Sequence, residues 1–210
     1  MLVSELVRTT SVPLATVKYY LREGLLSPGR KTAARSAEYD ESHVRRLALL
    51  RLLRDVGQIP VSRLRDLVHA TEDTRLSVHE MFARATELLA PAPPPGPRDP
   101  EARALADRLV EEAGWDEVRP DSVSRENLAA ALETIGAWLP GVDPLVAARG
   151  YVRLADELAQ AEIASLDDRG DRAHLLEQMV VGTVLFERLL TVLRRIAEEQ
   201  HSAQRFRDRY

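Results

Sequence analysis

A ten-residue stretch at positions 91–100, PAPPPGPRDP, constrains the fold of this chain more than any other. It holds six prolines. Each proline fixes its own backbone and lacks the amide hydrogen that helices and sheets need. Such a segment is expected to be a semi-rigid, extended linker. We therefore predict that the chain of 210 residues divides here into two domains.

Before the linker, apolar residues recur at spacings of three and four, which is typical of helices, and the alternation typical of strands is almost absent. The pattern predicts short helices at 4–10, 13–23 and 61–69, a longer helix from Asp40 to Gly57, and a connecting helix at 73–89. Residues 25–39 include Pro28 and Gly29, and they predict a loop or a small two-stranded wing.

After the linker, the signals for helix starts are clear. Asp99-Pro100 and Asp143-Pro144 each place a proline at the first helical position after a capping aspartate. With Ser124 as a further cap, they predict helices at 99–114, 124–140, 143–165 and from Asp171 to beyond Gln200. The last helix is apolar on more than one side, so neighbours in its own subunit or in a second one must bury it.

These patterns predict a mainly all-α fold, with a winged helix-turn-helix head followed by a C-terminal helical bundle of about four helices. The predicted domains are a head at 1–70, a connecting helix at 71–90, the proline linker at 91–100 and a helical domain at 101–210.

Charge separates the two halves of the chain. Residues 1–70 carry twelve Lys/Arg and seven Asp/Glu, a net charge of +5, whereas residues 71–210 carry seventeen and twenty-six, a net charge of −9. The total of −4 therefore conceals a basic head and an acidic body.

Several classes of function are excluded by composition. The chain has no cysteine, which excludes disulfides, thiolate metal sites and iron–sulfur clusters. Its five histidines include no pair at metal-binding spacing and none near a nucleophile motif, so we expect no metal, no cofactor and no enzymatic activity. The most apolar segment, 179–186, is followed at once by Glu187 and Arg188, so we expect a soluble, cytoplasmic protein that does not enter the membrane.

Residues 17–35, VKYYLREGLLSPGRKTAAR, combine a tyrosine pair, a helix stop at Gly24 and five basic side chains. Basic side chains neutralise the phosphates of duplex DNA and orient a protein on it. In the order helix, turn, helix, wing, the second helix would present Thr16, Lys18, Tyr19 and Arg22 to the DNA. The segment therefore predicts a DNA-binding head.

The run SELVRTTSVPLATVKYYLREGLLSPGR, followed by EYDESHVRRLALLRLLRDVG, resembles the N-terminal domain of the MerR family of transcriptional regulators over residues 1–70. KYYLREGLL matches the family's recognition-helix segment, and Tyr39 opens the next helix as in the family. The resemblance implies that Lys18, Tyr19 and Tyr20 contact the DNA backbone or buttress such contacts, and that Arg54 reaches the backbone from the end of the third helix.

The chain departs from the family pattern at two places. Ala15 stands where family members commonly have an arginine, and Arg35-Ser36-Ala37 replaces a Gly-Tyr-Arg motif in the wing. By this comparison Arg35, Arg30 or Lys31 would supply the missing wing cation.

The C-terminal domain contains a small set of large aromatic residues: Trp115, Trp138, Tyr151 and Phe186. They would either wall an apolar ligand pocket between helices or form part of a plain core.

Taken together, these features predict a homodimer, joined through the C-terminal bundle, that presents two recognition helices to a two-fold operator in double-stranded DNA. An apolar small molecule would modulate it, and RNA polymerase would be a partner at the promoter. Two alternatives remain open at this point. One is an architectural, excisionase-like protein that bends DNA without an effector. The other is a protein-interaction module with a vestigial head.

Overall fold

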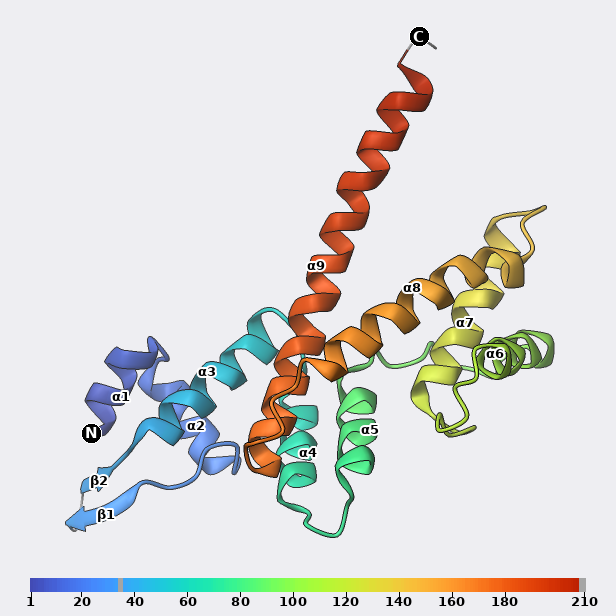
Figure 1. The fold of residues 1–210 in the computed structure, drawn as a ribbon. Helices are drawn as coiled ribbons and strands as arrows, with labels where there is room; N and C mark the ends of the chain where they lie inside the picture. Colours follow the sequence, from blue (N-terminus) through green and yellow to red (C-terminus); the bar gives the residue numbers. More distant parts are fainter. Residues whose placement is uncertain (34–35, 208–210) are drawn as a thin grey trace. The chain divides into compact units, whose positions relative to one another are not determined.

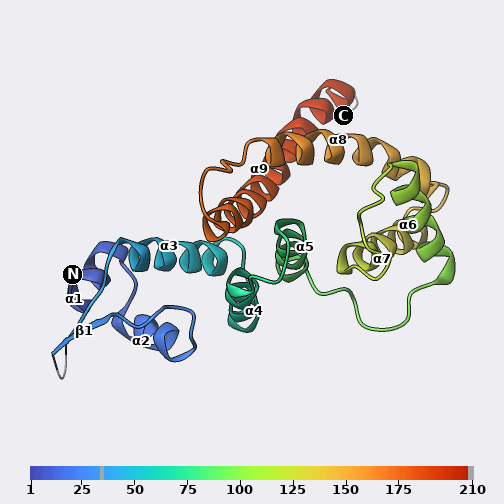
Figure 2. The same ribbon diagram turned by 60° about the horizontal axis from the view of Figure 1, so that its bottom comes forward.

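The computed structural model describes residues 1–33 and 36–207. Its N-terminal part follows the order helix, helix, wing, helix, helix (Figure 1). The elements are α1 (Val3–Thr10), α2 (Leu14–Arg22), β1 (Arg30–Ala33), β2 (Ser36–Glu38), α3 (Glu41–Asp55) and α4 (Val61–Glu72). The two strands are antiparallel. Both views show α1, α2 and the wing gathered at the amino-terminal end of α3 (Figures 1 and 2).

The remaining elements are all helices: α5 (Val78–Leu89), α6 (Pro100–Glu112), α7 (Val123–Trp138), α8 (Pro144–Ala164) and α9 (Arg172–Phe206). The predicted all-α fold class with a helix-turn-helix head is confirmed. Asp99, Asp143 and Asp171 accept backbone hydrogen bonds at the starts of their helices, as their sequence signals predicted.

Two predicted helix starts are wrong, and in both cases a serine replaces the expected cap. The connecting helix begins at Val78 instead of Asp73, because Ser77 and Glu80 form a reciprocal capping box: Ser77 N–H donates to Glu80 Oε2 at 2.7 Å. The helix α7 begins at Val123, because the side chain of Ser122, and not that of Ser124, accepts from the N–H of Arg125.

Contacts divide the chain into two compact units. Unit 1 comprises residues 1–82 and 170–210, and unit 2 comprises residues 83–169. This division differs from the predicted domains, because it places α9 with the head and the proline segment inside unit 2. Independent folding of 1–70 and 101–210 stays a prediction.

The core of unit 1 joins the head to the beginning of α9. Leu6, Val17 and Leu47 are fully buried in the head. The first turns of α9 pack against α3 and α4 and bury side chains that include Leu176, Val180 and Val184. Beyond Val184, α9 projects away from the other helices of the unit (Figure 1).

Unit 2 has a small core of its own, formed where α6, α7 and α8 meet. Its buried members are Ala106, Leu109, Ala129, Leu132 and Leu145. The C-terminal bundle therefore consists of three helices instead of the expected four, since α9 packs against α3 and α4.

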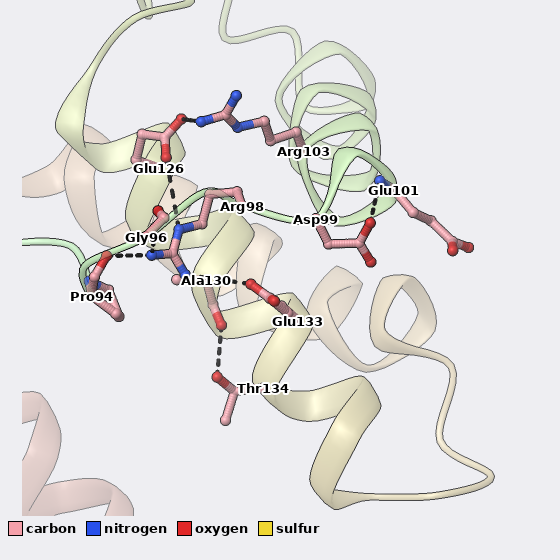
Figure 3. A network of polar contacts seen from close by, with 10 residues as sticks. All are labelled: Pro94, Gly96, Arg98, Asp99, Glu101, Arg103, Glu126, Ala130, Glu133 and Thr134. Carbon is pink, nitrogen blue, oxygen red and sulfur yellow. Dashed lines mark hydrogen bonds and ion pairs between the residues drawn. The ribbon is translucent and has the colours of Figure 1, made fainter.

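The proline segment is fastened to unit 2 by Arg98, whose side chain is only 8% exposed (Figure 3). The guanidinium of Arg98 forms ion pairs with Glu133 at 3.4 Å and Glu126 at 4.0 Å, both on α7. It also donates to the backbone oxygens of Pro94 and Gly96. Asn127 adds a hydrogen bond to the oxygen of Pro91 at 3.0 Å. The segment is extended, as predicted, but it lies against α7.

Candidate nucleic-acid interface

The helix α2 has one buried and one exposed face. Val17 and Tyr20, three residues apart, are 0% and 2% exposed. Lys18 and Arg22, four residues apart, are both exposed and share the opposite face, while Thr16 and Tyr19 are partly exposed between them. The helix therefore presents two cations at a spacing of about one turn.

The end of α2 is fixed by a Schellman motif. Leu25 N–H donates to the oxygen of Tyr20 at 2.9 Å, and Gly24 N–H donates to that of Leu21 at 3.4 Å. This turn needs the left-handed conformation that Gly24 adopts, with φ +72°. The predicted stop at Gly24 is confirmed, and it directs the chain toward the wing.

The two tyrosines have different roles. Tyr20 belongs to the core, and its hydroxyl accepts from Arg54 Nη1 at 3.4 Å, which connects α2 to the end of α3. Tyr19 is partly exposed, and the guanidinium of Arg22 lies 5.1 Å from its ring centroid. Tyr20 is thus placed to support Arg54, whereas Tyr19 orients Arg22.

Arg54 is exposed, and Asp55 accepts from its Nε at 2.9 Å. This hydrogen bond is the main reason why the pKa of Arg54 is raised. The guanidinium is therefore held by Tyr20 and Asp55 at the end of α3.

A contact that the sequence did not reveal joins α2 to α4. Glu23, directly after α2, forms an ion pair with Arg65 of α4. The two residues are 42 positions apart, and no local pattern signals their pairing. The pair helps to hold the recognition helix on the rest of unit 1.

In the wing, β1 and β2 pair Arg30 with Glu38 and Lys31 with Ala37. Arg30 Nη2 lies 2.6 Å from Glu38 Oε2, so the Arg30 cation is already paired across the strands. Lys31 is exposed and has no ion pair among the described residues. Arg35, the third candidate for the wing cation, lies outside the described residues.

Gly29 allows the wing to close on the start of α3. A Cβ at this position would lie 2.7 Å from the oxygen of Glu38 and 3.1 Å from the ring of Tyr39. Tyr39 in turn pairs with the chain start, since its N–H donates to the oxygen of Met1 at 2.8 Å. These contacts fix the base of the wing.

The start of α3 is a capping box built by Asp40 and His43. The side chain of Asp40 accepts from the hydroxyl and the N–H of Ser42, and the backbone N–H of Asp40 donates to His43 Nδ1 at 3.2 Å. The hydrogen bond from the Ser42 hydroxyl, followed by that with His43, holds the pKa of Asp40 well below its usual range. His43 is 7% exposed, so it is a buried capping residue.

The charge of each unit follows the same division as the fold. From the sequence, residues 1–82 and 170–210 carry a net charge of +4, and residues 83–169 carry −8, which together give the −4 of the chain. The basic charge therefore belongs to the unit that contains α2 and the wing, where it would attract polyanions.

The four aromatic residues predicted to line a ligand pocket are not gathered within one unit. Trp115, Trp138 and Tyr151 belong to unit 2, and Phe186 belongs to unit 1. Trp138 is 79% exposed at the end of α7, and Trp115 donates from Nε1 to Asp156 Oδ1 at 2.8 Å. Neither unit by itself forms the predicted aromatic pocket.

Among the described residues, no group of three or more His, Asp or Glu side chains is placed to hold a metal ion. No helix in the described ranges is long and apolar enough to cross a membrane.

Comparison with known proteins gives two matches. The family model of the MerR HTH family regulatory proteins matches residues 1–71. Over 98% of both chains, this protein is similar to the crystal structure of SCO5550 from Streptomyces coelicolor A3(2), described as a "putative transcriptional regulator". The two are 34% identical, with a TM-score of 0.72. No curated protein matches the chain.

Proposed function

The chain belongs to the MerR family of helix-turn-helix transcriptional regulators, and from this premise we propose that it acts as a homodimer on a two-fold operator. Binding to DNA follows from the family. The dimer, the operator and the modulation by a small molecule are the parts proposed here.

The observation that carries the proposal is an uncovered apolar stripe on α9. Phe186, Leu189, Leu193 and Ile196 follow a 3-4-3 spacing, and their side chains are between 43% and 58% exposed in the single chain. This is the spacing of a coiled-coil seam. From 185 to 206, α9 spans about three heptads, or roughly 33 Å. By contrast, α5 has only 12 residues, too few for a self-sufficient coiled coil.

The stripe is wider than the seam of a two-stranded coiled coil, because Leu185, Leu190 and Val192 are also exposed beside it. A stripe of this width suits a bundle in which each helix has two neighbours. The helix α8 offers exposed apolar side chains of its own, among them Tyr151 and Leu154. We therefore propose that α9 and α8 of two chains form the dimer interface, as an intermolecular four-helix bundle.

In such a dimer, two recognition helices would contact DNA through Lys18 and Arg22, with Lys31 of the wing on the backbone. An apolar small molecule would modulate binding, and RNA polymerase would be met at the promoter. The alternative of an excisionase-like architectural protein is less well supported. The similarity to a solved regulator extends over nearly the whole chain, unit 2 included. The same similarity includes residues 1–71, which disfavours a vestigial head.

The experiment starts from DNA fragments selected by the purified full-length protein. Fluorescence anisotropy at several salt concentrations would compare the wild type with the double variant Lys18→Ala/Arg22→Ala. Loss of two phosphate contacts in each head should weaken binding and flatten the salt dependence by about 0.9 per contact.

The matched control is Arg108→Ala/Arg169→Ala, which removes the same charge from exposed positions of unit 2. It should bind like the wild type. Equal losses in the two variants would mean that net charge alone, and not α2, is responsible, and the assignment of the recognition helix would fail.

A further inference from the structure

A cavity of about 640 Å³ lies within unit 1, away from every predicted site residue. Its walls come from four segments: the turn after α2 with the loop that follows, the first half of α3, the end of α4, and the first turns of α9. It is therefore the place where the DNA-binding head meets the helix that carries the proposed dimer stripe.

The floor of the cavity is apolar. Leu25 comes from the turn after α2, Leu49 from α3, and Leu176 and Val180 from α9. Each of these side chains is less than 9% exposed, so the floor is a stable part of the core. A floor of this kind accommodates the apolar body of an organic molecule.

The polar groups of the cavity are unequal. Arg45 and Arg46 line it from α3. Arg45 is exposed and has no ion pair among the described residues, and Arg46 donates from Nε to the oxygen of Leu25 at 3.1 Å, which directs its guanidinium. On α9, the carboxylate of Asp171 is engaged as the helix cap, since it accepts from His174 N–H at 2.9 Å. Glu177 is the second acid in the lining.

We propose that this cavity binds a small organic anion with an apolar body, such as an aryl carboxylate or sulfonate. The anionic group would be held by Arg45 and Arg46 through charge-assisted hydrogen bonds, and the apolar body would cover the floor. The net charge of +4 on unit 1 favours an anion over a cation.

An occupant would touch α3 and α9 at once and would bias the direction in which α9 leaves the head. In a dimer joined through α9, that direction sets the separation of the two recognition helices. The regulatory consequence rests on the proposed function, whereas the binding of the anion does not.

The test uses the full-length protein and two dyes. The first, 8-anilinonaphthalene-1-sulfonate, has an aryl body and a sulfonate, and the second, N-phenyl-1-naphthylamine, has a similar body without the charge. Both would be titrated by fluorescence. Since exposed leucines on α9 also attract such dyes, the result is read from variants. Arg45→Glu reverses one charge, and Ala173→Trp fills the cavity from the exposed start of α9.

We expect one saturable site per chain for the sulfonate. Arg45→Glu should weaken its binding at least tenfold and leave the uncharged dye within twofold, whereas Ala173→Trp should remove this site for both dyes. Ala48→Trp, at an exposed position of α3 outside the cavity lining, is the matched control and should behave like the wild type. Circular dichroism would verify that each variant is folded.

Sulfonate binding that is absent in the wild type, or unchanged in Ala173→Trp, would overturn the proposal, as would equal effects of Arg45→Glu on both dyes. A DNA phosphate is the competing anion. If DNA displaces the sulfonate and Arg45→Glu also flattens the salt dependence of DNA binding, the arginines serve the DNA backbone and the small-molecule site is refuted. If the sulfonate binds as expected but no DNA is bound, the proposed function fails and the cavity stands.

Discussion

At the scale of single residues, Gly57 has two functions where the sequence indicated one. It ends α3, as its position predicted. It also lies under α9, because a Cβ at this position would be 3.3 Å from Val184 Cγ2 and 2.8 Å from the oxygen of Leu53. The contact with backbone leaves little room for adjustment.

We expect Gly57→Ala to lower the free energy of unfolding by about 1–3 kcal/mol, through overpacking between α3 and α9. Urea unfolding monitored by circular dichroism measures this. Gly150→Ala is the matched control, because Gly150 is helical and no described atom lies within 4 Å of its added Cβ. It should stabilise the protein by up to about 1 kcal/mol. A neutral Gly57→Ala would contradict the close approach of α9.

Asp40 gives a prediction on pH. Its pKa is lowered in the folded protein from the ordinary value of 3.8, mainly by the hydroxyl of Ser42. Its ionised form therefore contributes stability that is present above pH 4 and is lost as the pH falls further. Asp40→Asn keeps a capping side chain that does not titrate, so its urea midpoint should fall less than that of the wild type between pH 5 and pH 3. Parallel curves for the two proteins would show that Asp40 is not the group responsible.

At the scale of secondary-structure elements, α9 combines two different halves in one helix. Its first turns are buried in unit 1, and its exposed stripe begins after Val184. We expect Leu189→Glu/Leu193→Glu to convert a dimer into a monomer in sedimentation velocity, because four charges would meet in one apolar seam.

The control for the stripe is Thr191→Glu, on the face of α9 away from the 3-4-3 positions. It should remain dimeric, and both variants should retain the helical signal in circular dichroism. A dimer that survives the double substitution would place the interface elsewhere.

At the scale of the whole molecule, the predicted fragments remain the decisive test of how the dimer is made. We expect residues 101–210 to be dimeric, and residues 1–90 to be monomeric or weakly associating, with reduced affinity for the operator because one head makes half of the contacts. The structure adds an expectation for 1–90. Without α9, the surface of α3 and α4 that is covered by Leu176, Val180 and Val184 becomes exposed, so this fragment should unfold at lower urea than the full chain.

Sedimentation equilibrium of the two fragments measures their association. A dimeric 1–90 together with a monomeric 101–210 would show that α5 suffices for pairing and that the interface on α9 is wrong.

Much of the head was predictable because its signals are local. The cap at Asp40, the Schellman turn at Gly24 and the proline starts of α6 and α8 are each made by residues within a few positions of one another. The two errors in helix starts are also local, since Ser77 with Glu80 is a capping box that can be read in the sequence. The burial of Tyr20 beside the partly exposed Tyr19 follows from the helical period.

The sequence by itself therefore determined the helical elements, the helix-turn-helix head, its basic charge and its family, because hydrophobic period, capping residues and motif spacing act over short stretches. Only the tertiary structure decided that α9 packs against α3 and α4, that Glu23 pairs with Arg65, and that the proline segment lies against α7. The residues in these contacts are between 28 and more than 100 positions apart along the chain. Their pairing depends on how whole helices share a core, and no pattern within one segment encodes that choice.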